Sequence, residues 1–229
     1  MGVFAGPDIN ESGLVLCLDA ANRKSYPTTG TTWTDLSGNG NNGTLVNGVG
    51  YNGSNGGSLS FDGVDDYVNF SFVNPFAETV MVWARSATST WNTDGWISSS
   101  RRENGHIIHP VNYLGTKKVV EYYILNSSAS YTLIGGVTPT DLTIPHMYAY
   151  TTNGSNLHKA YLDGIEVASS SSSITRTASP TAQIWYLGKD DTAGRFGNGN
   201  IYNCLRYNRA LSASEISQNF NATRSRFSI

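Results

Sequence analysis

"TTNGSNLHKAYLDGIEVAS", residues 151–169, contains runs of strand-forming residues separated by two turn signals. Asn153–Gly154 and Asp163–Gly164 are pairs that tight hairpin turns prefer, because these residues tolerate positive φ. The runs on either side alternate apolar and polar residues, as half-buried strands do. Together with the preceding run at 146–152, this stretch predicts a three-stranded antiparallel meander.

The same alternation recurs along most of the chain, interrupted by turn residues and not by long helical patterns. Many short antiparallel strands predict an all-β, single-domain jelly-roll β-sandwich of two antiparallel sheets. We predict strands at 13–20, 58–63, 67–70, 79–85, 118–125, 130–135, 146–152, 157–164, 165–169, 182–188 and 200–207.

One short C-terminal helix is predicted in "LSASEISQNF", residues 211–220. Ser212 and Glu215 have the spacing of a capping box, with Leu211 and Ile216 placed as a hydrophobic staple. We therefore divide the chain into an N-terminal docking segment at 1–12, the jelly-roll domain at 13–220 and a C-terminal tail at 221–229. The docking segment has two alternatives, a neighbouring subunit or the domain itself.

The overall charge excludes one large class of function. The 229 residues carry a formal net charge of −2, and only 14% of them are charged, so no basic field attracts nucleic acid.

No apolar run approaches the 18 residues of a membrane span, so no membrane insertion is expected. The start, "MGVFAGPDINESG", lacks the features of a signal peptide, which predicts synthesis in a host cytoplasm without export. Cys17 and Cys204 fit no metal motif and are expected as buried free thiols.

The stretch "TTWTDLSGNGNNGTL", residues 31–45, begins like a calcium-binding loop. Asp35, Ser37 and Asn39 stand at its first, third and fifth positions and Gly40 at its sixth, whereas Val46 takes the place of the bidentate glutamate. The favoured interpretation is an Asx-rich turn, in which these side chains bond their own backbone. A calcium ion completed by distant oxygens is the alternative.

A second acidic cluster lies in "FDGVDDYV", residues 61–68. Asp65 and Asp66 are adjacent, so in a strand they point to opposite faces and cannot act as an acid/base pair on one substrate. A tight turn at Asp62–Gly63, with Asp66 capping backbone amides, is favoured over a shared cation.

Other chemistry finds little support in the sequence. His106 and His109 stand three residues apart, and a strand sends such residues to opposite faces, so they are not expected to chelate a metal. No nucleophile elbow or dinucleotide-binding motif is present. Trp91 and Trp96 flank "NTDG" and are candidates for stacking on sugar rings, with packing in the core or at its rim as the alternative.

Several stretches, taken together and in order, resemble the laminin-G-like domains of the concanavalin A-like lectin/glucanase superfamily. They are "WTDLSGNGNNGTL" (33–45), "GGSLSFDGVDDYVNF" (56–70), "TVMVWAR" (79–85), "KAYLDGIEVAS" (159–169) and "LGKDD…FGNGNIYNCLRYNRALSASEI" (187–191 and 196–216). The resemblance spans about residues 13–220 and implies a two-sheet jelly roll with a carbohydrate- or protein-binding role. It also implies a calcium ion at the rim of the sandwich, for which Asp35, Asn39 and Asp66 are candidates.

Glycoside hydrolases of this superfamily carry two catalytic glutamates in an E-x-D-x-x-E pattern. Glu103, Glu121, Glu166 and Glu215 are each isolated, so no enzymatic activity is expected.

The resemblance is to proteins of phage virions and of bacterial surfaces. The leading hypothesis is a non-enzymatic virion structural protein, a capsid decoration or a tail-fibre adhesin, located in the virion. Its expected partners are other virion proteins or copies of itself, and a cell-surface glycan. The alternative is a carbohydrate-binding module of a bacterial surface or secreted protein.

Overall fold

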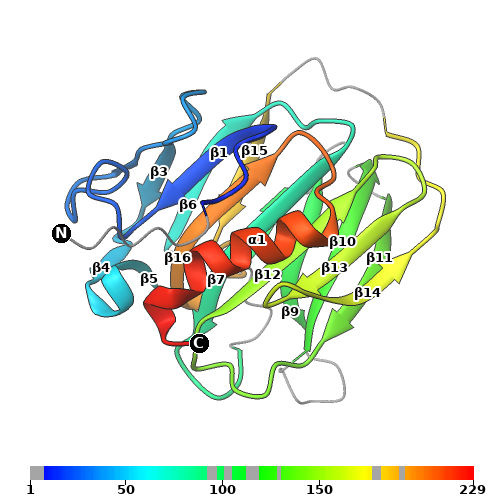
Figure 1. Cartoon of the computed structure of the whole chain (residues 1–229). Coiled ribbons are helices and arrows are strands. Elements are labelled where there is room, and N and C mark those ends of the chain that lie inside the picture. The colour runs from blue at the N-terminus through cyan, green and yellow to red at the C-terminus, as the bar shows by residue number, and fades with distance from the viewer. Residues whose placement is uncertain are drawn as a thin grey trace.

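The computed structural model describes residues 8–91, 97–100, 105–111, 119–127, 130–176, 182–190 and 194–229, and places them in two antiparallel sheets (Figure 1). The first sheet has the order β14 (Ile165–Ser170), β13 (His158–Leu162), β12 (His146–Thr152), β7 (Glu78–Ser86), β16 (Asn198–Tyr207), β5 (Ser58–Asp62) and β4 (Gly50–Asn52), and β1 (Leu14–Asp19) also pairs with β16. The second has the order β11 (Ser130–Val137), β10 (Val119–Ser127), β9 (His106–Val111), β8 (Ser98–Ser100), β15 (Gln183–Leu187), β6 (Tyr67–Phe72), β3 (Gly43–Val46) and β2 (Thr32–Trp33). The prediction of a single-domain jelly-roll sandwich is confirmed.

The predicted meander is present as β12, β13 and β14, which pair in sequence order. Asp163 and Gly164 both have positive φ, +51° and +80°, as the turn between β13 and β14 requires. The other connection is longer than two residues. Asn153 orders it by accepting hydrogen bonds from the backbone N–H groups of residues 155–157 through its side-chain oxygen.

Five strands are missing from the sequence-based prediction, namely β2, β3, β4, β8 and β9. Four of them have two to four residues, and their sequences, such as "GYN" and "SSS", have little strand propensity. Pairing with neighbours distant in the sequence holds them in place, and local patterns do not record that pairing.

The main core lies between the sheets, and a second apolar layer covers the outer face of the first sheet. There α1 (Ala213–Thr223) and the 3-10 helix η3 (Arg224–Phe227) lie across the strands (Figure 1). The Trp83 indole stacks on Phe220 with 5.6 Å between ring centroids and lies 4.3 Å from the Phe227 ring. Its Nε1 donates a hydrogen bond of 2.8 Å to Thr223 Oγ1. The C-terminal helices therefore cover part of the outer face of this sheet.

The helix begins as predicted. Ser212 Oγ accepts a hydrogen bond from the Glu215 N–H, and the Glu215 carboxylate accepts one from the Ser212 N–H, which confirms the capping box. In the described residues, no helix is long and apolar enough to cross a membrane.

The boundary predicted between the domain and a tail at 221–229 falls inside α1, which runs from Ala213 to Thr223. Phe227 is 8% exposed and belongs to the apolar layer on the first sheet. At the other end, the backbone N–H of Asn10 donates to Asn219 Oδ1 at 2.7 Å, and its side-chain amide donates to Glu215. The described part of the docking segment therefore binds the domain's own helix.

The two cysteines lie on adjacent strands but on opposite faces. In the pairing of β1 with β16, Cys17 lies opposite Leu205 and Cys204 lies opposite Leu18. Cys204 faces the core between the sheets, whereas Cys17 packs with the layer under the helix. Burial raises the pKa of each thiol to about 12, and both cysteines are free, Cys204 buried as predicted and Cys17 half-buried.

Candidate functional site

The Asp35 loop is organised by its own backbone. Asp35 Oδ1 accepts hydrogen bonds from the N–H groups of Cys17 and Ser37, and Oδ2 accepts from Ser37 Oγ and the Asn41 N–H. Four donors occupy the acceptor positions of one carboxylate. Asn39 turns its side-chain amide to Ser37 Oγ as a donor. In this geometry Asp35 and Asn39 make an Asx-rich turn, the interpretation favoured from sequence.

A different acidic cluster does gather oxygens. Asp62, Asp65 and Asp66 each bring one carboxylate oxygen to within 4.8 Å of the others. Asp66 is 4% exposed, and its Oδ2 accepts a hydrogen bond from the Asp62 N–H at 3.1 Å. Burial raises the pKa of Asp66, and the neighbouring Asp62 and Asp65 charges add to this shift, against the lowering effect of that hydrogen bond. Of the three metal candidates named from sequence, Asp66 alone belongs to this cluster.

The two tryptophan candidates have different outcomes. Trp96 lies outside the described residues. Trp91 is 4% exposed and packs edge-to-face against Tyr148, with ring centroids 6.4 Å apart. Burial of the indole favours packing in the core, the alternative named from sequence, and sugar stacking by Trp91 stays a prediction.

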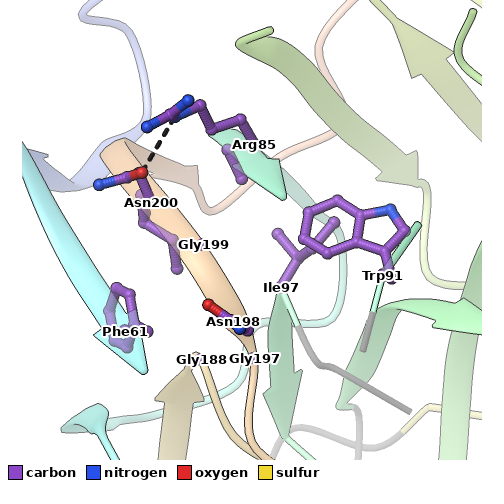
Figure 2. A pocket seen from close by; sticks show the side chains of 11 residues that line it. Phe61, Arg85, Trp91, Ile97, Gly188, Gly197, Asn198, Gly199 and Asn200 are labelled. Carbon is purple, nitrogen blue, oxygen red and sulfur yellow. Dashed lines mark hydrogen bonds between the residues drawn. The ribbon is translucent and has the colours of Figure 1, made fainter. Parts of the chain in front are cut away.

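Trp91 lines a narrow hollow at one end of the sandwich (Figure 2). Figure 2 shows Phe61 across the hollow from Ile97 and Trp91, and the hydrogen bond of 2.9 Å from Arg85 Nε to Asn200 Oδ1 at its edge. A Cβ on Gly199 would lie 2.1 Å from the Arg85 carbonyl oxygen, so the strands approach too closely for any larger residue. We assign this hollow to close packing.

The predicted separation of His106 and His109 is confirmed in β9. His106 points into the core, where its Nε2 lies 2.8 Å from Ser98 Oγ and burial lowers its pKa to about 3. His109 points to the outer face of the second sheet, where its ring packs 5.5 Å from that of Tyr123. The two imidazoles cannot share a metal ion.

The outer face of the second sheet carries an aromatic hollow lined by Ile107, His109, Tyr123 and Tyr131. The Tyr123 and Tyr131 rings meet at 90° with centroids 5.2 Å apart. Tyr131 is 62% exposed, and Leu133 beside it is 46% exposed. This combination gives a wall of partly exposed ring surface, which a ligand with an apolar face can contact.

Polar groups are placed beside these rings. Glu121 lies opposite His109 in the pairing of β10 with β9, and the Tyr123 hydroxyl donates a hydrogen bond to the Glu121 carboxylate. Burial, and the hydrogen bond to Glu121, raise the pKa of the Tyr123 hydroxyl well above its usual range, so the hydroxyl stays protonated. Ring faces next to a carboxylate and an imidazole offer both a stacking surface and hydrogen-bonding groups to a ligand.

Strand alternation explains why the sequence produces this hollow. In "VVEYYIL", residues 119–125, Val120, Tyr122 and Ile124 face the core, so Glu121 and Tyr123 face outward. Residues that are directly paired on neighbouring strands point to the same face of a sheet. One row of such pairs therefore carries the outward face from β11 to β6. The row is Leu133, Tyr123, Ile107, Ser99, Tyr186 and Asn69. The alternation was readable in the sequence, whereas the order of the strands was not.

A buried ionic cluster lies in the core and is structural. Glu78, fully buried, accepts hydrogen bonds from Arg176 Nη1 at 2.9 Å and Arg206 Nη2 at 2.5 Å, and from the Tyr150 hydroxyl. The Arg206 guanidinium also stacks 3.7 Å from the Trp185 ring centroid. Burial acts to raise the pKa of Glu78, but the two guanidinium groups overcome it and lower the pKa to about 2. No solvent-accessible atom of Glu78 is available for chemistry.

The sequence profile of Laminin_G_3, described as the concanavalin A-like lectin/glucanases superfamily, matches residues 61–217. No match was found among curated protein sequences.

Solved structures share the fold at low sequence identity. Domain 4 of AbnA, an extracellular arabinanase from Geobacillus stearothermophilus in complex with arabinotriose, superposes with a TM-score of 0.68 at 16% identity, over 92% of this chain and 99% of that chain. Trypanosoma rangeli sialidase in complex with sialic acid gives 0.66 at 17% identity, over 95% of this chain and 34% of that chain. The botulinum neurotoxin serotype D binding domain gives 0.69 at 16% identity, over 93% of this chain and 52% of that chain. At these identities the similarity establishes the fold alone.

Proposed function

The chain belongs to the Laminin_G_3 family of the concanavalin A-like lectin/glucanase superfamily, and on this premise we propose that it is a non-enzymatic glycan-binding protein of a phage virion surface. The observation that carries the proposal is the aromatic hollow on the outer face of the second sheet. The C-terminal helices cover part of the outer face of the first sheet, whereas the partly exposed rings of Tyr123 and Tyr131 lie on the other side of the sandwich. Two neighbours of the same fold are complexes with arabinotriose and with sialic acid, which supports a glycan as the ligand.

The chemistry at the hollow favours binding over hydrolysis. Glycosidases, whether retaining or inverting, place two carboxyl groups on either side of the glycosidic bond that they cleave. Among the described residues, the hollow has Glu121 opposite His109, and the Glu121 carboxylate accepts a hydrogen bond from the Tyr123 hydroxyl. A carboxylate held in this way suits hydrogen bonding to sugar hydroxyls.

Two features support the virion assignment, namely the low content of charged residues and the presence of free thiols. Few residues are charged, and two buried free cysteines suit a protein assembled in a reducing cytoplasm. Its partners in a particle would be other virion proteins or copies of itself.

A carbohydrate-binding module of a bacterial surface or secreted protein is the second candidate, favoured by the match to nearly the whole of an arabinanase domain. Detection of the chain in purified phage particles or in a bacterial cell-surface fraction distinguishes the two.

Replacing Tyr131 with alanine tests the glycan site. Because Tyr131 is 62% exposed, the change removes stacking surface without opening a cavity in the core. We expect the affinity for any glycan bound by the wild type to fall at least about tenfold, as for the loss of an aromatic anchor, with the unfolding midpoint unchanged. Titration calorimetry with hits from a glycan array gives the measurement. Ile165→Ala, at a 70% exposed position on β14 of the first sheet, is the matched control. Equal binding by Tyr131→Ala and wild type would place the glycan elsewhere.

We propose calcium as a bound ion at Asp62, Asp65 and Asp66. Their oxygens lie within 4.8 Å of one another, a spread that fits one shell with Ca–O distances of about 2.3–2.6 Å. A cation there would offset the burial of the Asp66 carboxylate and its repulsion by Asp62 and Asp65, which together raise the pKa of Asp66.

Calcium is then expected to raise the midpoint of thermal unfolding, by about 2.7 kcal/mol of added stability at 100 times its dissociation constant. Asp66→Asn should abolish the shift, while Asp8→Asn, an exposed residue away from the cluster, should keep it. Identical melting curves with calcium and with a chelator would contradict the site.

A further inference from the structure

We propose that the glycan bound on the outer face of the second sheet carries an anionic group, a carboxylate or a phosphate, which Lys189 receives. This inference rests on the proposed glycan-binding function and specifies its ligand class. The observation behind it is an ammonium group that aromatic rings hold in place beside the hollow.

Lys189 follows β15 and extends over a cluster of three rings. Its Nζ lies 4.4 Å from the centroid of Tyr67, 5.1 Å from that of Tyr186 and 5.7 Å from that of Phe196. Lys189 and Phe196 are joined by an isolated β-bridge, so backbone pairing fixes the base of the side chain. Cation–π contacts then fix its end. The ammonium is therefore positioned before any ligand arrives.

The ammonium lacks an anionic partner in the described part of the chain. The adjacent Asp190 is fully buried and pairs with Arg195 at 3.5 Å. None of the described side chains accepts a hydrogen bond from Lys189 Nζ, whose contacts are the three rings. Lys189 and the rings are each half-buried, so solvent reaches the group. Within the described part of the chain, its three N–H donors and its positive charge have no anion bound to them.

The Lys189 cluster lies on the same face of the second sheet as the aromatic hollow, with β8 between β9 and β15. Ser99 Oγ donates a hydrogen bond of 2.8 Å to the Lys189 carbonyl oxygen, and Ser99 lies directly opposite Ile107, which lines the hollow. Along the row of paired residues, Tyr123 and Tyr186 are three strand steps apart, about 14 Å at the usual strand spacing. Ile107 and Ser99, which stand between the two tyrosines in this row, are buried, so a glycan of several units seated at Tyr131 passes over the atoms that cover them to reach Lys189.

The opposite charges of Glu121 and Lys189 determine which end of the glycan lies at which end of this surface. Glu121 repels an anion at the Tyr123 end, and Lys189 attracts one at the Tyr186 end. A neutral unit therefore stacks at Tyr131, and the acidic unit lies at Lys189.

The test is a glycan array with neutral, carboxylated and phosphorylated members, probed with the wild type, Lys189→Met, Lys189→Arg and Tyr131→Ala, followed by titration calorimetry of the hits. Methionine keeps the length of the side chain and its contact with the rings, whereas arginine keeps the charge. We expect wild-type binding to acidic members, a loss of about tenfold or more for Lys189→Met, and retention for Lys189→Arg. A methyl-esterified form of a carboxylated hit should bind the wild type as weakly as the acid binds Lys189→Met. The carboxylated and phosphorylated members separate the two sources of the anion.

Binding confined to neutral glycans, or unchanged binding of acidic ones by Lys189→Met, overturns the inference and leaves the glycan-binding function in place. Loss of all binding in Tyr131→Ala alone supports the hollow without Lys189. Failure of the wild type to bind any member contradicts the proposed function and the inference together.

Discussion

Replacing Glu78 with alanine should lower the free energy of unfolding by about 3–5 kcal/mol, because two buried guanidinium groups lose their common carboxylate. Arg176 and Arg206 both bond Glu78 in the core, and the side chains of all three are fully buried in this ion-pair network. The other described neighbours of Glu78 that can ionise, His106 and Tyr150, are neutral, so neither supplies a second anion. Urea denaturation followed by tryptophan fluorescence measures the loss.

Glu166→Ala is the matched control for this prediction. Glu166 pairs with Lys159 at 2.8 Å on the surface, where an ion pair contributes at most about 1 kcal/mol. If Glu78→Ala and Glu166→Ala unfold at the same urea concentration, the buried cluster does not stabilise the sandwich.

The same carboxylate predicts how stability depends on pH. Its pKa is about 2 in the folded protein, below the ordinary value of 4.5. A lowered carboxyl pKa contributes stability that is complete above the unfolded value and is lost as pH falls from about 4.5 towards 2. The wild type should therefore lose more stability across this range than Glu78→Ala, and the difference between the two proteins should shrink in acid.

Replacing Trp83 with alanine should cost about 3–5 kcal/mol, the usual range for a buried tryptophan. The side chain is 1% exposed and contacts both C-terminal helices through Phe220, Phe227 and Thr223. Because these contacts join the helices to the first sheet, hydrogen exchange in 213–227 should accelerate more than in β10.

Trp83→Phe separates packing from hydrogen bonding. Phenylalanine keeps an aromatic ring against Phe227 but loses the bond from Nε1 to Thr223, so about 1 kcal/mol should be lost. Unchanged exchange in α1 of the alanine variant would show that the helix is held by other contacts.

The fold was predictable from local patterns wherever the pattern was long. The meander and the capped helix follow from turn pairs and spacing that need no distant partner. By contrast, β8 is "SSS", whose pairing with His106–Ile108 of β9 arises from the assembled sheet. Such strands carry no signal of their own, since tertiary contacts override propensity.

The site was harder to predict for the same reason. The sequence suggested two tryptophans beside a loop as candidates for stacking on sugar rings, but Trp91 packs in the core. Tyr123 and Tyr131 come from neighbouring strands, and their meeting depends on register, including the bulge that places Tyr123 opposite Leu133. A single sequence gives the face of each residue but not which strand lies beside it.

The position of β16 also determines when the protein can fold during translation. This strand pairs with β1, β5 and β7, all of which leave the ribosome well before it. Until residues 198–207 emerge, those strands lack a common neighbour and expose backbone edges that pair readily with other chains. The nascent chain therefore depends on protection from aggregation for most of its synthesis, and co-expression with a chaperone that holds unfolded chains should raise the soluble yield.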